Sequence, residues 1–177
     1  NVLRRLLKGG TVEFSGKAAT MENFRSYWAS GDVLLMPTHA KARRNSYLSY
    51  LELHGQERLF SHDIFNASGQ LTNTELVVLS ACESGLPDAR VIDETMGLMS
   101  SFLVAGAKMV LSTYWAIADQ TTSPVVTEFL VGVVDKGLSP AVALSRATAA
   151  VRERHPHPYF WAPFFLMGRH RYGNSES

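Results

Sequence analysis

The chain of 177 residues has a single cysteine, Cys82. One cysteine excludes an internal disulfide framework and a cysteine-rich zinc site. A lone free thiol is typical of a reducing compartment, and we therefore expect a cytoplasmic protein.

Several other features are scarce or missing. Formal net charge is only +1, which favours neither a nucleic-acid nor a membrane partner. The first eight residues are basic and lack the hydrophobic region of a signal peptide. The apolar stretch 96–118 is broken at Gly106-Ala107-Lys108, which indicates a helix followed by a strand rather than a membrane-spanning helix. No glycine-rich loop joins a strand to a helix, which argues against a nucleotide- or phosphate-binding domain.

What is present is an alternation of apolar strands with amphipathic helices. Apolar runs predict strands over 32–37, 75–81, 108–114 and 163–168, and imperfect alternation predicts another over 46–53. Helical patterns lie between them, one with Ser61 as its cap and one starting at Ser139-Pro140. This order predicts an α/β fold with a mostly parallel sheet and helices on both faces. We expect one domain over residues 1–177, with a loose tail at 169–177.

Two chemically reactive residues follow two of these strands. His39 comes after the strand at 32–37, and Cys82 comes after the strand at 75–81. The carboxyl ends of parallel strands share the sheet edge where α/β proteins place ligands, so the two side chains are expected in one crevice. A thiolate beside an imidazole is the minimum equipment of a cysteine protease. The alternative for Cys82 is an inert buried thiol that serves only packing.

The neighbouring residues suggest supporting roles. The backbone amides of Ala40 and Cys82 are candidates to stabilise the oxyanion of the reaction. Acidic residues follow in the expected loop 83–94 and after the next strand, and we single out Glu83, Asp93 and Asp119 as candidates to bind a basic substrate side chain. The alternatives are a solvated acidic loop and, for Asp119, a helix cap. This chemistry requires no metal and no cofactor.

The chain resembles the CHAT family, which comprises caspase-like domains related to separase and commonly joined to tetratricopeptide repeats. The resemblance covers roughly residues 16–168 and rests on these motifs: Thr38-His39, 77–85 (VVLSACESG), 102–107 (FLVAGA), Trp115, Asp119 and 159–164 (YFWAPF). It implies a caspase-like three-layer sandwich and a His–Cys dyad at His39 and Cys82. The first strand of the family's domain is not recognisable, so we expect residues before Asn1 to complete the sheet.

The resemblance implies an intracellular cysteine endopeptidase that cleaves a protein or peptide partner. An attached sensor or repeat region outside this chain would control it, as in bacterial defence systems. One departure from the family matters: Ala40 stands where the family usually has Gly, and alanine does not adopt the backbone angles reserved for glycine. The alternative function is therefore a catalytically silent domain that scaffolds a complex.

Overall fold

The computed structural model describes residues 12–41, 43, 45–79, 89–115, 117 and 119–168, with the backbone alone for 89–95 and 119–121. The chain divides into two compact units, an N-terminal unit over residues 14–116 and a C-terminal unit made mainly of residues 117–168. The prediction of a single domain over the whole length stays a prediction.

The N-terminal unit is built around a parallel sheet of three strands. Strands β1 (Val33–Met36), β5 (Leu76–Leu79) and β6 (Met109–Thr113) lie in the order β1-β5-β6, and both pairings are parallel. All side chains of β5 and β6 are buried, as expected of strands covered on both faces. The predicted α/β class with a mainly parallel sheet is confirmed. Strands β1 and β6 are each one residue shorter than predicted at both ends, and β5 begins one residue later than predicted, while residues 80–81 of its predicted end lie outside the described residues.

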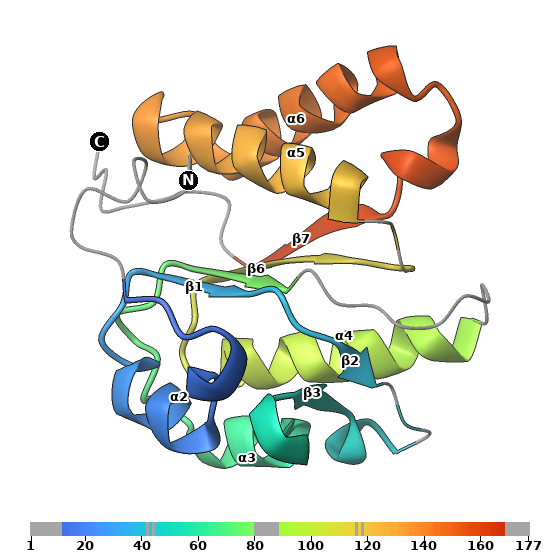
Figure 1. Ribbon diagram of the computed structural model, residues 1–177. Helices are drawn as coiled ribbons and strands as arrows, with labels where there is room; N and C mark the ends of the chain where they lie inside the picture. The colour runs from blue at the N-terminus through green and yellow to red at the C-terminus, as the bar shows by residue number, and fades with distance from the viewer. Residues whose placement is uncertain are drawn as a thin grey trace. The chain divides into compact units, whose positions relative to one another are not determined.

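Helices cover the parallel sheet of this unit. Helix α4 (Ala89–Val104) runs along one face, with α3 (Ser61–Asn66) packed against it, and α2 (Met21–Tyr27) lies on the same side (Figure 1). Phe102 and Met99 of α4 are fully buried. Burying two large apolar side chains stabilises the fold by about 3–6 kcal/mol, so α4 is a main support of the sheet.

A second, antiparallel sheet of three short strands was not predicted as such. It consists of β2 (Ala40–Lys41), β3 (Tyr50–Glu52) and β4 (Arg58–Phe60). The predicted strand over 46–53 is only partly right, because the 3-10 helix η2 (Ser46–Leu48) replaces its first half. The side chain of Asn45 accepts the Tyr47 N–H and favours this turn over an extended strand.

The predicted cap at Ser61 is wrong. Helix α3 begins at Ser61, and Phe60 is the residue before it. The Phe60 N–H donates to the Asp63 carboxylate at 3.2 Å, while the buried hydroxyl of Ser61 lies 2.6 Å from that of Ser101 on α4. Ser61 therefore joins two helices instead of capping one.

The C-terminal unit is formed by two packed helices and a strand. Helix α5 (Asp119–Leu130) continues into a π-helical turn η4 (Val131–Asp135), and α6 (Pro140–Arg154) packs back against both (Figure 1). As predicted, α6 starts at Pro140 with Ser139 before it. The unit ends with the 3-10 helix η5 (Pro158–Phe160) and strand β7 (Phe164–Gly168), and α6 contacts β7.

Short 3-10 helices complete the N-terminal unit. They are η1 (Gly16–Ala18) and η3 (His54–Gln56), which contact each other. The Glu57 carboxylate after η3 accepts the Met21 N–H at 2.6 Å, which attaches the start of α2 to the antiparallel sheet.

Candidate active site

The carboxyl ends of β1 and β5 lie side by side, as the sequence predicts. Val33 pairs with Leu76, and the pairing continues in register to Met36 opposite Leu79. The next strand, β6, pairs with β5 from Val77 onward, so the predicted neighbour of the second strand is confirmed. Parallel strands end at one edge, and residues that follow β1 and β5 leave the sheet at that edge.

The amino ends of the same strands, far from the candidate site, are joined by a structural ion pair. Lys108 and Glu75 precede β6 and β5, and their partly buried side chains form a close ion pair. The Lys108 N–H also donates to the Thr74 carbonyl at 3.0 Å. These contacts tie the starts of neighbouring strands together, so this charge pair belongs to the framework and not to the candidate site.

His39 leaves the parallel sheet three residues after the end of β1. The Thr38 N–H donates to the Met36 carbonyl at 3.0 Å, which closes a tight turn around Pro37. The Glu52 N–H then donates to the His39 carbonyl at 2.8 Å. The residue is exposed, and its main chain is held between the parallel sheet and strand β3.

Thr38 adds a second attachment to the same strand. Its hydroxyl donates a short hydrogen bond to the Glu52 carbonyl. Glu52 thus holds residues 38–39 through both of its backbone polar groups. Its N–H donates to the His39 carbonyl, and its carbonyl accepts from the Thr38 hydroxyl. The sequence marks Thr38 as part of a motif with His39, but it gave no sign of Glu52 or of this contact, because the antiparallel sheet that brings the residues together was not expected.

Ala40 begins strand β2 and pairs with Leu51 of β3. Because the His39 carbonyl accepts the Glu52 N–H, Ala40 and Leu51 form the non-hydrogen-bonded type of antiparallel pair. In such a pair the amide of each residue is directed away from the partner strand, so the Ala40 N–H points away from β3. Ala40 does not have a positive φ, and the backbone here needs no glycine.

The remaining predicted site residues fall partly or wholly outside the described parts of the chain. Cys82 and Glu83 lie outside the described residues. Asp93 is in α4 and Asp119 is the first residue of α5, and their side chains lie outside what is described. The grouping of these acids with His39 stays a prediction.

The expected loop 83–94 needs one correction. Helix α4 begins at Ala89, so residues 89–94, Asp93 among them, are helical. The sequence 89–96 (ARVIDETM) has no glycine or proline, and several of its residues are good helix formers. Asp93 and Glu94 are the fifth and sixth residues of this helix, so acidic residues alone did not indicate a loop here.

The described residues lack the features of two other kinds of site. They contain no group of three or more His, Cys, Asp or Glu side chains that fits a metal ion. No helix in the described parts of the chain has the length and apolar character needed to cross a membrane.

Comparison with known proteins gives a match at the level of family. The family model of the CHAT domain matches residues 1–169. No curated protein matches the chain.

Proposed function

We propose, on the premise that the chain belongs to the CHAT-domain family of caspase-like proteases, that it is a cysteine endopeptidase with His39 and Cys82 as its dyad. The chain belongs to the CHAT-domain family, because the family model matches residues 1–169. The reaction, the dyad and the substrate are our proposal.

The observation that supports the dyad is the register of β1 against β5. Residue 33 pairs with residue 76 and residue 36 with residue 79, so paired residues are 43 positions apart in the sequence. His39 and Cys82 are separated by the same 43 positions. Each follows the last paired residue of its strand by three positions, which favours a shared place beyond the sheet edge.

The proposed reaction uses these groups in two steps. The Cys82 thiolate adds to the scissile carbonyl, and the carbon–nitrogen bond then breaks while the His39 imidazolium gives its proton to the leaving amine. Water next hydrolyses the thioester, with His39 accepting a proton from that water. Two backbone N–H groups would stabilise the oxyanion in both steps.

Ala40 fits the role of one oxyanion donor. Its N–H is directed away from β3, so it is not used in the ladder of the antiparallel sheet. Its backbone conformation is one that alanine adopts without strain. The replacement of glycine at this position is therefore compatible with catalysis, which favours the enzyme over the silent scaffold.

We further propose that the protein acts in the cytoplasm and that an attached sensor or repeat region controls it. A thiolate nucleophile needs a reducing environment, and the single cysteine of the chain suits one. The partner we propose is a protein or peptide substrate.

The test is covalent labelling of the nucleophile followed by peptide cleavage. A peptide aldehyde ending in Arg, Lys or Met should protect Cys82 from iodoacetamide, as read by mass spectrometry of the digested protein. Cys82→Ala and His39→Ala should each reduce cleavage of the matching fluorogenic peptides by at least 100-fold. His54→Ala is the matched control, because His54 is an exposed histidine of the same unit in the turn η3.

Two results would contradict the proposal, one for the role of His39 and one for proteolysis as a whole. If His39→Ala cleaves as fast as His54→Ala while both keep the circular dichroism spectrum of the unmodified chain, His39 is not part of the catalytic site. If no peptide is cleaved and Cys82 is never protected, with the sensor region supplied, the scaffold alternative holds.

A further inference from the structure

We propose that Arg43 and Arg58 form a binding site for an acidic segment of a partner protein. Both guanidinium groups lie against the ring of Tyr50, with Cζ atoms 5.5 and 4.7 Å from the ring centroid. We call these two residues the arginine pair. The proposal does not depend on proteolysis.

The arginine pair is held in place by its surroundings. The Tyr50 ring is only 3% exposed and packs edge-on against Phe60 at 5.4 Å. Arg43 donates to the Tyr50 hydroxyl at 3.3 Å, and its own backbone N–H donates to the buried Ser49 hydroxyl at 3.0 Å. Contact with one buried aromatic ring restricts the movement of both guanidinium groups before any ligand arrives.

Charge then points to the kind of ligand. Two like charges share one ring, and both arginines are exposed to solvent. Among the described residues, no ion pair joins either guanidinium to a carboxylate. A carboxylate bound beside either guanidinium would offset the repulsion between the two cations and accept charge-assisted hydrogen bonds from planar donors that match its geometry.

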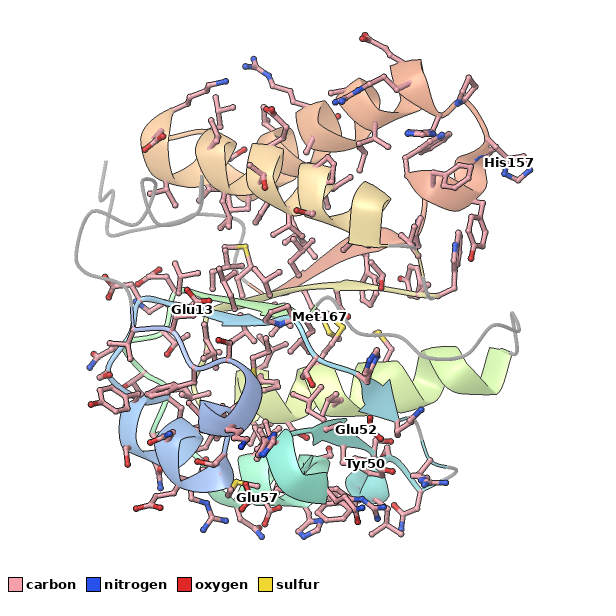
Figure 2. All side chains as sticks on the ribbon, in the orientation of Figure 1. Glu13, Tyr50, Glu52, Glu57, His157 and Met167 are labelled. Atoms are coloured by element: carbon pink, nitrogen blue, oxygen red, sulfur yellow. The ribbon has the colours of Figure 1, made fainter. Side chains whose placement is uncertain are left out.

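The same face of the sheet favours a short acidic segment over a nucleic acid. Glu52 lies on the face that bears Tyr50, directly opposite Arg58 in the register of β3 and β4, and Figure 2 labels Tyr50 and Glu52 together on β3. This carboxylate confines the positive charge to a small area, which suits the one or two carboxylates of a short segment better than the many successive phosphates that a nucleic-acid site contacts. The net charge of +1 also lacks the broad positive field typical of nucleic-acid binding proteins.

Exposed apolar side chains close to the site suit a protein partner. Phe60 stacks on His62 at 5.2 Å, and the His62 ring nitrogen lies 3.0 Å from the Tyr47 carbonyl. Tyr47 and Phe65 contact each other edge-on, yet they are 51% and 39% exposed. An aromatic surface beside fixed arginines is the composition typical of protein interfaces.

The experiment is equilibrium binding of fluorescein-labelled hexaglutamate, followed by fluorescence anisotropy. The full 177-residue chain with Cys82→Ala is used, so that cleavage cannot consume the probe and failure of the proposed protease activity leaves this test intact. Arg43→Gln and Arg58→Gln should each weaken binding by about tenfold, because each removes charge-assisted hydrogen bonds. Arg43→Lys and Arg58→Lys keep the charge and test the need for the planar group if a Gln variant fails to fold.

The matched control removes the same charge from another exposed arginine pair. Arg152 stacks on Trp161 at 5.7 Å, and Arg146 is exposed on the same helix α6. The double variant Arg146→Gln/Arg152→Gln should change hexaglutamate binding less than twofold, while Arg43→Gln/Arg58→Gln should abolish it. Equal losses of binding in the two double variants would show that net charge alone accounts for the binding, and would overturn the proposal.

A second probe distinguishes a protein segment from a nucleic acid. If labelled hexathymidylate binds as tightly as hexaglutamate through the same arginines, the choice of a protein segment is wrong.

Discussion

At the scale of single residues, Thr38 is the side chain through which the antiparallel sheet holds the segment of His39. Its hydroxyl bonds the Glu52 carbonyl, and the Glu52 N–H bonds the His39 carbonyl. If His39 is the general base that we propose, a small displacement of this segment should affect catalysis more than stability, because a general base must lie within hydrogen-bond reach of the group it serves.

Replacement of this hydroxyl gives the first prediction. Thr38→Val keeps the shape of the side chain and removes the donor, which should lower the free energy of unfolding by about 1 kcal/mol. If our proposed dyad is right, kcat should fall by about tenfold or more with KM little changed. Peptide hydrolysis and urea unfolding measure the two effects.

Thr38→Ser is the matched control, since it keeps the hydroxyl and should retain most of the activity. Equal kcat values for the Ser and Val variants would show that this hydrogen bond does not position His39.

Asp119 also has two possible roles at this scale. The sequence suggests that it selects a basic residue before the cut, and the alternative is that it caps a helix starting near Gln120. The helix starts one residue earlier than that, so Asp119 is its first residue and not the cap before it. The structure makes Asp119 the first residue of α5, where a negative charge interacts favourably with the helix macrodipole.

The two roles of Asp119 separate in one variant. If the carboxylate selects the substrate, Asp119→Asn should reduce the preference for Arg over Leu peptides by at least tenfold in kcat/KM. If it stabilises the helix, that preference should stay constant while the free energy of unfolding falls by about 0.3–1 kcal/mol. Cleavage after Arg and Leu at equal rates by the unmodified enzyme would exclude the selecting role.

At the scale of elements, the junction of α4 and β6 depends on Gly106. The residue has φ of +113°, and a Cβ atom there would lie 3.0 Å from the Thr72 amide nitrogen and 3.1 Å from the Leu71 carbonyl carbon. Both neighbours are backbone atoms, which side-chain rotation cannot move. The chain therefore turns from helix to strand against the segment before β5, with no room for a side chain.

We expect Gly106→Ala to lower the free energy of unfolding by about 2–4 kcal/mol, because backbone strain and overpacking add. Gly69→Ala is the control: its φ is +79°, but a Cβ atom there meets nothing within 4 Å. Its cost should be the strain alone, about 1–2 kcal/mol. Urea unfolding of the two variants measures the difference, and equal losses would mean that the backbone around residues 71–72 moves aside.

The elements that sequence reasoning predicted best are those with one dominant signal. The buried strands β5 and β6 are continuous apolar runs, and Pro140 after Ser139 marks the start of α6. Strands β2, β3 and β4 have two or three residues each, which is too short for a periodic pattern. Their pairing depends on contacts between segments distant in sequence, so His39 was predicted as a site residue while its attachment to Glu52 was not.

At the scale of the whole molecule, charge is distributed unevenly along the chain. Residues 1–60 have nine Lys or Arg and five Asp or Glu, although the complete chain has a net charge of only +1. Arg43 and Arg58 belong to this basic part, which lies mostly in the N-terminal unit. The attraction of an acidic partner would therefore be local, and it should weaken as added salt screens the exposed charges.

The pairing of β1 with β5 has a consequence for the lengths of chain that this fold tolerates. Between the two strands lie the antiparallel sheet, α3 and the turn at 67–73, where residues 68–70 are exposed. The burial of the apolar side chains of these strands sets the register, whatever the length of the connection. Insertions or deletions in that exposed turn would change the number of residues between the histidine and the cysteine without changing which strand ends are neighbours. In related sequences, strand pairing is thus a better guide to the two positions than a fixed count of residues.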